Sequence, residues 1–235
     1  MIISLWSGPR NCSTALMYSL AQRSDMAVRD EPLFGHYLAH TGADRPSRVE
    51  TLAQWPTTAE AALDRCRAAN DDAPHLFLKH MGNHTEGLPV SAFSTHHHVV
   101  LTRHPDAVIK SYSAHVETPT MEDLCYAHQL AWAEQCLASN WPVRVVESDA
   151  LLESPREVLT DLCKWLGLPW DESIMQWSPG ARPEDGPWAK YWYERVHLST
   201  GWEARPRKVY PVAEQMQELR DEALDLYEAL LRING

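Results

Sequence analysis

Five short apolar runs, each of a length typical of a buried strand, recur along the chain. They are residues 2–6 (IISLW), 26–30 (MAVRD), 75–80 (HLFLKH), 97–102 (HHVVLT) and 143–148 (VRVVES). Runs that are apolar throughout, rather than alternating, are typical of parallel strands covered on both faces. The pattern therefore predicts a parallel sheet with helices packed against it.

Stretches with helical spacing of apolar residues separate these runs. We predict helices over 13–23, 58–69, 106–113 and 121–138, and a further one that begins at Ser154-Pro155. Thr57-x-x-Glu60 reads as a capping box for the second of these helices. The segment 213–233 is amphipathic, with Met216, Leu219, Leu224, Tyr227 and Leu231 on its apolar face.

Strands that alternate with helices predict an α/β fold, and the length of 235 residues suits one domain over 1–235. The segments 39–57 and 178–190 are rich in proline, glycine and charged residues. We predict them to be long loops that can fold over a site. Ligands on such sheets bind at the carboxyl ends of the strands.

Composition places the chain among ordinary globular proteins, with 44% apolar and 23% charged residues. No apolar run approaches the ~18 residues of a membrane span, and the start MIISLW lacks the basic region of a signal peptide. The five cysteines show no CxxC spacing, which fits reduced thiols. A soluble cytoplasmic protein is expected.

The net charge of −11 argues against nucleic acid or a membrane surface as a partner. Any site for an anion must therefore be local. The first loop offers one, because Gly8-Pro9-Arg10-Asn11-Cys12-Ser13-Thr14 joins a strand to a helix. Backbone N–H groups at such a junction bind phosphate, the two hydroxyls add donors, and Arg10 adds charge.

This loop is not the phosphate loop of kinases. That loop requires G-x-x-x-x-G-K-[ST], and counting from Gly8 places Ser13 and Thr14 where the second glycine and the lysine belong. An ATP-dependent phosphotransferase is therefore disfavoured, although it remains an alternative.

The chain resembles the PAPS-dependent sulfotransferases, where PAPS is 3′-phosphoadenosine 5′-phosphosulfate. Pro9-Arg10-x-x-Ser13-Thr14 is similar to their 5′-phosphosulfate loop, and Arg103-His104-Pro105 with Ser111 is similar to their 3′-phosphate motif. The spacing between Arg103 and Ser111 also has a physical explanation. Arg103 ends a strand and Ser111 follows two helical turns later, so the two can hold one phosphate.

The resemblance implies a three-layer αβα fold like that of P-loop NTPases, PAPS as the sulfuryl donor, no required metal, and a small-molecule acceptor with a hydroxyl or amine. It also implies a nucleotide-closing loop carried by Trp188 and Lys190. Here Ala189 separates those two residues, and Ala15 stands where the family has an aromatic residue. The departures at Ala15 and at Arg10, which stands where the family usually has a lysine, keep a non-catalytic nucleotide-binding relative as a further alternative.

Three residues are the first candidates for catalysis: Arg10, Glu31 and His80. Arg10 stands where the family usually places a lysine, and it can supply charge but no proton. Glu31, in RDEPLF, resembles the base of carbohydrate-type sulfotransferases, and His80 lies near where cytosolic relatives carry a histidine base. His84 is an alternative base, and Lys79 is either a second cation near the leaving group or a surface residue.

Two histidine pairs have the i, i+4 spacing of metal ligands: His36 with His40, and His80 with His84. Neither pair has an evident third ligand, so a structural or substrate-lining role is preferred. The identity of the acceptor and the oligomeric state are left open.

Overall fold

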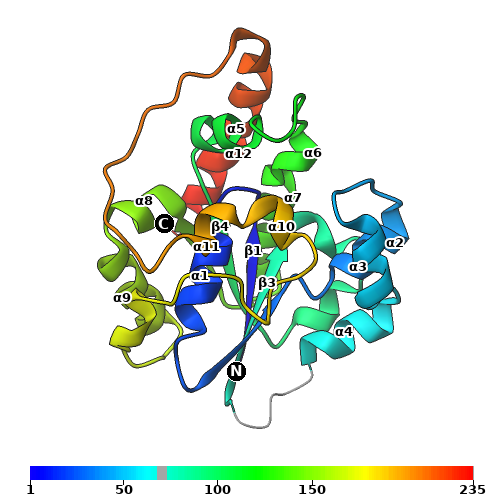
Figure 1. Ribbon diagram of the computed structural model, residues 1–235, viewed down its shortest axis with the longest axis vertical. Coiled ribbons are helices and arrows are strands. Elements are labelled where there is room, and N and C mark those ends of the chain that lie inside the picture. Colours follow the sequence, from blue (N-terminus) through cyan, green and yellow to red (C-terminus); the bar gives the residue numbers. More distant parts are fainter. Residues whose placement is uncertain (68–72, 235) are drawn as a thin grey trace.

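The central element is a sheet of five parallel strands (Figure 1). The computed structural model describes residues 1–67 and 73–234. The strand order is β2-β3-β1-β4-β5. The bounds are β1 Ile2–Ser7, β2 Met26–Asp30, β3 His75–Met81, β4 His97–Thr102 and β5 Val143–Glu147. Each predicted strand is confirmed to within one residue.

Helices fill most of the intervals between strands. The α-helices are α1 Ser13–Leu20, α2 Phe34–Thr41, α3 Arg48–Gln54, α4 Ala59–Arg67, α5 Pro105–Tyr112, α6 Met121–Leu124, α7 Tyr126–Ala138, α8 Ser148–Glu153, α9 Pro155–Trp165, α10 Ala189–Trp192, α11 Glu194–His197 and α12 Gln217–Arg232. Short 3₁₀ turns are η1 Gly82–Thr85, η2 Val90–Phe93, η3 Glu172–Met175 and η4 Glu214–Met216.

Four details of the helix prediction need correction. The helix predicted over 121–138 is two helices, because Cys125 adopts a left-handed conformation with φ 64°. The loop predicted over 39–57 contains α3 and the end of α2. Helix α4 begins after Thr58, whose hydroxyl accepts from the Ala61 amide, and its predicted end at residue 69 lies outside the described residues. On α12, Leu230 is buried whereas Leu231 is 39% exposed.

The side chains of β1 alternate between two apolar layers. Ile3 and Leu5 pack with α1 and α9 on one face of the sheet, and Trp6 packs with α7 and α12 on the other. Figure 1 shows helices on both sides of the strands. This is the three-layer αβα arrangement expected when parallel strands are apolar on both faces.

The register of the sheet determines which loops meet. Ser7, the last residue of β1, pairs with Met81 of β3 and with Leu101 of β4. The loop that follows β1 therefore lies between the ends of β3 and β4, at the point where the chain connections diverge to the two sides of the sheet. Helices α10 and α11 lie across these carboxyl ends (Figure 1).

The described residues hold no helix with the combined length and apolar character of a membrane span. All five cysteines are free thiols, as the spacing predicted.

A group of buried histidines lies in the layer beside β1. The His80 ring stacks on Trp6 with centroids 4.4 Å apart. His98 accepts a hydrogen bond from the Trp6 indole at 3.1 Å, and His96 pairs with the Ser4 hydroxyl at 2.8 Å. Burial favours the neutral imidazole, so these rings act as aromatic core residues.

Acidification is expected to destabilise the fold through these rings. Burial lowers the pKa of His96 and of His98 to about 4, and that of His80 well below its usual range. The unfolded chain, with histidine pKa values near 6.5, then binds more protons than the folded chain between about pH 6.5 and pH 4, so the free energy of unfolding falls as the pH falls through that window. Glu31, whose burial raises its pKa, acts in the opposite direction but as one group. Urea unfolding at about pH 7 and about pH 5 measures the difference, and a stability that is constant or higher at pH 5 would contradict the prediction.

His96→Asn is the matched variant, because its amide keeps a partner for Ser4 but does not titrate. Its free energy of unfolding should depend on pH less steeply, by about one proton. An unchanged slope would assign the acid sensitivity to other groups.

Candidate active site

The loop between β1 and α1 is shaped by two residues in the left-handed conformation. Arg10 and Cys12 have φ angles of 60° and 61°. Alternating right- and left-handed residues turn successive N–H groups toward one side and form an anion-binding concavity. The Asn11 side chain donates to the Leu101 carbonyl at 2.9 Å, and the Ser148 hydroxyl donates to the Asn11 carbonyl at 2.7 Å. The loop is thereby fastened to β4 and α8 in this conformation.

Helix α1 begins directly after this loop. Its N-cap residue, Cys12, makes no side-chain capping hydrogen bond. Ser13 and Thr14 in the first turn line the same cavity as the loop. Gly8 is required at the end of β1, since a Cβ there would lie 2.7 Å from the Leu124 carbonyl oxygen. The first turn of α1 thus presents backbone N–H groups and two hydroxyls to the cavity.

The two predicted anion motifs meet in space. Arg10 Nε donates to the Ser111 hydroxyl at 2.9 Å, although the two residues are far apart in sequence. Arg103 Nη1 donates to the Arg10 carbonyl at 3.1 Å, and its Nε pairs with Asp149 at 2.9 Å. The direct partner of Ser111 is therefore Arg10 rather than Arg103, and all three residues line one cavity.

This cavity has a volume of about 430 Å³ and is rich in positive charge. Eight cationic side chains line it, against four acidic ones. The cations are Arg10, Arg45, Lys79, Arg103, Arg195, Arg205, Arg207 and Lys208, and the acids are Glu31, Asp123, Asp149 and Glu203. In a chain of net charge −11, such a local excess of positive charge is complementary to an anion with more than one charge.

The cations repel one another. Burial and the guanidinium of Arg195 lower the pKa of Arg10, and Arg103 adds to the effect. A bound anion would offset this repulsion.

Three of these cations, Arg205, Arg207 and Lys208, come from a segment that sequence reasoning did not single out. The chain between α11 and α12 is extended and swings around one side of the molecule (Figure 1). It is tied down where the Arg205 amide donates to the Leu152 carbonyl at 2.8 Å and where Arg207 pairs with Glu147 at 2.8 Å. The signal was visible in the sequence, because Arg205-Pro-Arg-Lys208 is a basic run in an acidic chain.

A buried charge network forms where β2 and β3 end. Lys79 Nζ lies 2.8 Å from Asp30 Oδ1, 2.5 Å from Glu31 Oε1 and 2.8 Å from the Tyr193 hydroxyl. Burial opposes the charge on Lys79, but Asp30 and Glu31 hold its pKa well above its usual range. Trp188 and Tyr193 both donate to Asp30 Oδ2, at 3.0 and 2.8 Å. Lys79 is therefore a buried residue of the cavity wall and not a surface residue.

Glu31 combines several features of a functional carboxyl. Its backbone has φ 41°, which is strained for a residue with a side chain, and its amide donates to the Lys79 carbonyl at 2.8 Å. Burial raises the pKa of its carboxyl to about 7; neighbouring Asp30 adds to the rise, whereas Lys79 opposes it. Glu31 lines the cavity, and within the described ranges its Oε2 has no hydrogen-bond partner. This oxygen is free to accept a proton from a ligand.

The two histidines proposed as bases differ in position. His80 is fully buried against Trp6 and does not line the cavity, so this geometry gives no support for a catalytic role. His84 does line it, stacked on Phe34 with centroids 4.8 Å apart. Burial and the nearby charge of Lys79 lower the pKa of His84 well below its usual range, which makes it a weak base.

Of the two residues predicted to close over the nucleotide, Trp188 lines the cavity and Lys190 does not. Trp188 is buried, lines the cavity and donates to Asp30, as described above. Lys190 lies outside the cavity lining, exposed on the surface, in an ion pair with Glu50 at 2.7 Å. Since Ala189 begins α10, the two side chains leave the backbone in different directions.

His36 and His40 both lie on α2, with ring centroids 5.5 Å apart. His36 Nδ1 pairs with the Thr57 carbonyl at 3.3 Å. This contact agrees with the preferred structural role.

Comparison with known protein families gives a match over nearly the whole chain. Residues 1–233 match the model of a family described as sulfotransferase domain. Two curated proteins of Arabidopsis thaliana are also similar, the branched-chain-amino-acid aminotransferase-like proteins 1 and 2. They are 34% and 33% identical over 233 and 232 residues, which is 97% of this chain and 41% of each relative. The chain thus spans less than half the length of these relatives.

Solved structures share the fold. A sulfotransferase from Alicyclobacillus acidocaldarius has a TM-score of 0.57 at 12% identity, covering 99% of this chain and 96% of that chain. The sulfotransferase domain of the Synechococcus PCC 7002 olefin synthase has a TM-score of 0.53 at 16% identity, covering 100% and 95%. The predicted fold class, a three-layer αβα fold of the P-loop-like sulfotransferase type, is confirmed.

Proposed function

Because the chain belongs to the sulfotransferase family, we propose that it transfers a sulfuryl group from PAPS to a hydroxyl or amine of a small-molecule acceptor. One observation carries the choice of donor. Arg10 donates to Ser111 inside a cavity lined by eight cations, in a chain of net charge −11. A donor with phosphates at two separate positions suits an anion site assembled from two separate sequence motifs.

The residues present fit this donor. The concave loop of Gly8 to Cys12 and the first turn of α1 offer N–H groups for a 5′-phosphosulfate. Ser111 and Arg103 offer a hydroxyl and a guanidinium for a 3′-phosphate. When bound, PAPS supplies the sulfuryl group, and its 5′-phosphate takes the electron pair of the broken S–O bond.

The protein has three tasks in such a transfer. Arg10 and the loop amides offset the negative charge that grows on the leaving phosphate, and Arg10 does so without giving up a proton. Glu31 Oε2 takes the proton of the acceptor as the acceptor attacks sulfur. Lys79 holds Glu31 through Oε1 and so fixes the direction of the free oxygen. A pKa of about 7 suits Glu31 to this work near neutral pH, whereas His84 is too weakly basic.

The acceptor side of the cavity suits a small aromatic or partly apolar molecule. Glu31 shares the cavity lining with Phe34, Tyr37, Trp188 and Tyr193. A cavity of about 430 Å³ is in the usual range for small-molecule sites, which favours a compact acceptor over an extended chain.

We expect PAP, the 3′-phosphorylated product nucleotide, to stabilise the protein more than ADP does. A ligand that binds only the folded state raises the melting temperature, and the 3′-phosphate adds charge-assisted contacts worth about tenfold or more in affinity. Thermal-shift measurements with PAP, ADP, Mg-ATP and phosphate at equal concentrations test this. Equal shifts for PAP and ADP would overturn the assignment of the donor, and a preference for Mg-ATP would favour a phosphotransferase.

Ser111→Ala is the variant that locates the 3′-phosphate, and Ser113→Ala is its control. Ser113 directly follows the last residue of the same helix and is exposed, and its hydroxyl has no hydrogen bond to any described residue. Ser111→Ala should remove most of the advantage of PAP over ADP, and Ser113→Ala should leave it intact. Tight PAP binding without any release of PAP from PAPS, in the presence of phenols, alcohols and amines, would favour a non-catalytic relative.

A further inference from the structure

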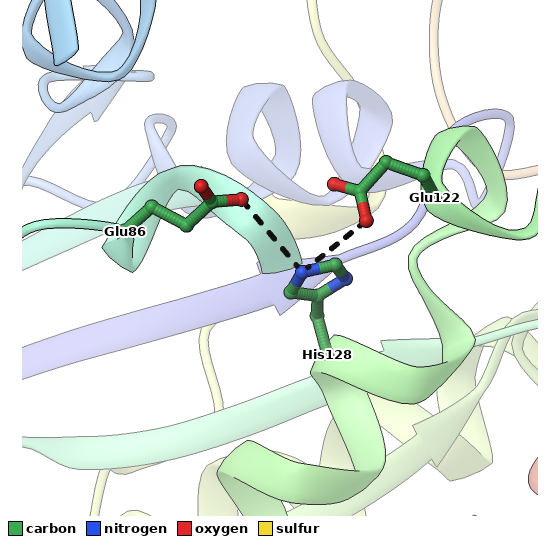
Figure 2. Close-up of side chains that lie close together, drawn as sticks. All are labelled: Glu86, Glu122 and His128. Carbon is green, nitrogen blue, oxygen red and sulfur yellow. Dashed lines mark ion pairs between the residues drawn. The ribbon is translucent and has the colours of Figure 1, made fainter. Parts of the chain in front are cut away.

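Three ligand-type side chains from separate segments converge outside the cavity (Figure 2). Glu86 follows η1, Glu122 lies on α6 and His128 lies on α7. Figure 2 shows both carboxylates turned toward the same edge of the imidazole ring. Sequence reasoning did not find this group, because the residues come together only through the packing of η1 against α7.

The distances are those of groups placed around a common centre. His128 Nε2 lies 3.6 Å from Glu122 Oε2 and 3.9 Å from Glu86 Oε1, and one ligand atom from each residue lies within 4.8 Å of the others. Both separations exceed a normal N–H···O hydrogen bond of about 2.7–3.2 Å. Ligand atoms bound tetrahedrally at about 2.0–2.2 Å from a zinc ion stand about 3.4 Å apart, so a small inward movement completes such a site.

The charge of the group is unbalanced. Within the described part of the chain, His128 is the one ion-pair partner of Glu86 and of Glu122. Among the residues that the structure describes, the one side-chain hydrogen bond to the Glu122 carboxylate is a long one, from Asn83 Nδ2 at 3.5 Å. The side chains of Glu86 and Glu122 are 41% and 51% exposed, so an ion can reach them from solvent.

We propose that Glu86, Glu122 and His128 bind a divalent first-row transition-metal ion of the zinc type. One imidazole nitrogen and two carboxylate oxygens are ligands that zinc takes, and water fills the remaining position. Magnesium is disfavoured, because it requires near-octahedral oxygen ligands. The proposal stands apart from sulfuryl transfer, since none of the three residues lines the cavity.

The ion would stabilise the part of the cavity lining that the junction of α6 and α7 provides, from the side that faces away from the cavity. Glu122 and His128 lie on either side of Cys125, where α6 and α7 meet with φ 64°. Asp123 and Cys125, on that corner, line the cavity, and Asp123 pairs with Arg45 at 2.9 Å. A metal bound by Glu86, Glu122 and His128 would hold the junction of α6 and α7 against the segment that follows β3.

Titration calorimetry of the purified, metal-stripped protein with Zn²⁺ tests the proposal, with Mg²⁺ as the comparison cation. One Zn²⁺ should bind per chain and raise the melting temperature, with little effect of Mg²⁺. Each of His128→Asn and Glu122→Gln should weaken Zn²⁺ binding by about tenfold or more. Circular dichroism confirms that the variants remain folded.

His104→Asn is the matched control, because His104 faces a single carboxylate, that of Asp106, at 3.7 Å. Its Zn²⁺ affinity should equal that of the unaltered protein. Absence of stoichiometric binding, or binding that His128→Asn leaves unchanged, would overturn the proposal. Neither result bears on PAP binding, so failure of this site and failure of the proposed function are distinguishable.

Discussion

Replacing Lys79 with methionine is expected to lower the free energy of unfolding by about 3–5 kcal/mol, because the change leaves two buried carboxylates without their cation. Lys79 is 2% exposed and bonds both Asp30 and Glu31. Methionine preserves most of the side-chain volume, so the loss reports charge rather than packing. Urea unfolding near pH 7 measures the effect.

Lys190→Met is the matched control for this change. Lys190 also pairs with a glutamate, Glu50, at a similar distance of 2.7 Å, but on the surface. Its replacement should leave the urea midpoint unchanged, since exposed ion pairs contribute little. Adding Asp30→Asn and Glu31→Gln to Lys79→Met should restore part of the lost stability. A Lys79→Met protein as stable as Lys190→Met would show that the buried network is not held by charge.

Replacing Glu31 with glutamine is expected to reduce sulfuryl transfer by about 10²- to 10⁴-fold, the usual contribution of a general base. The amide is close in shape to the carboxyl but cannot accept a proton from the acceptor. The rate is measured as release of PAP from PAPS, with the acceptor that reacts fastest among a panel of phenols, alcohols and amines. In the unaltered protein the rate should rise with pH up to about 7, where Glu31 loses its proton, and then level off.

Two further variants decide how a loss in Glu31→Gln is read. Glu172→Gln is the control, because Glu172 is an exposed glutamate paired with Arg156 on the surface; its rate should be unaltered. If Glu31→Gln keeps the full rate, the base is elsewhere, and loss of activity in His84→Asn would then identify it. If the residual rate of Glu31→Gln keeps the same rise toward pH 7, that rise does not come from Glu31.

The sheet was predictable because short runs that are apolar on both faces are typical of buried parallel strands. The divided helix was not. The stretch 121–138 has continuous helical periodicity, and the break comes from one backbone angle at Cys125, a residue type with no preference for the left-handed region. Helix α3 was hidden by the prolines and charges around it, at Pro46 and Pro56.

The predicted anion loop illustrates what local sequence can indicate about a site. Gly8, Ser13 and Thr14 are informative because a strand, a tight turn and a helix start constrain one another over a few residues. The spacing within the second motif paired Ser111 with Arg103, and the contact of Ser111 with Arg10 of the first motif was not predicted.

The buried charge network around Lys79 could not be predicted from local sequence. It depends on the register that places Asp30 beside Lys79 and on the return of Tyr193 from far along the chain. Likewise, a histidine at the end of a strand gave no sign that His80 would turn into the core.

The strand order has a consequence for synthesis of the chain. Neither β1 nor β2 pairs with the other, because β3 lies between them, and β1 receives its second neighbour only with β4. As the chain leaves the ribosome, β1 and β2 therefore remain without their shared neighbour β3 until residues 75–81 have emerged. During that interval both segments expose apolar side chains that the finished sheet covers, which favours association with other chains.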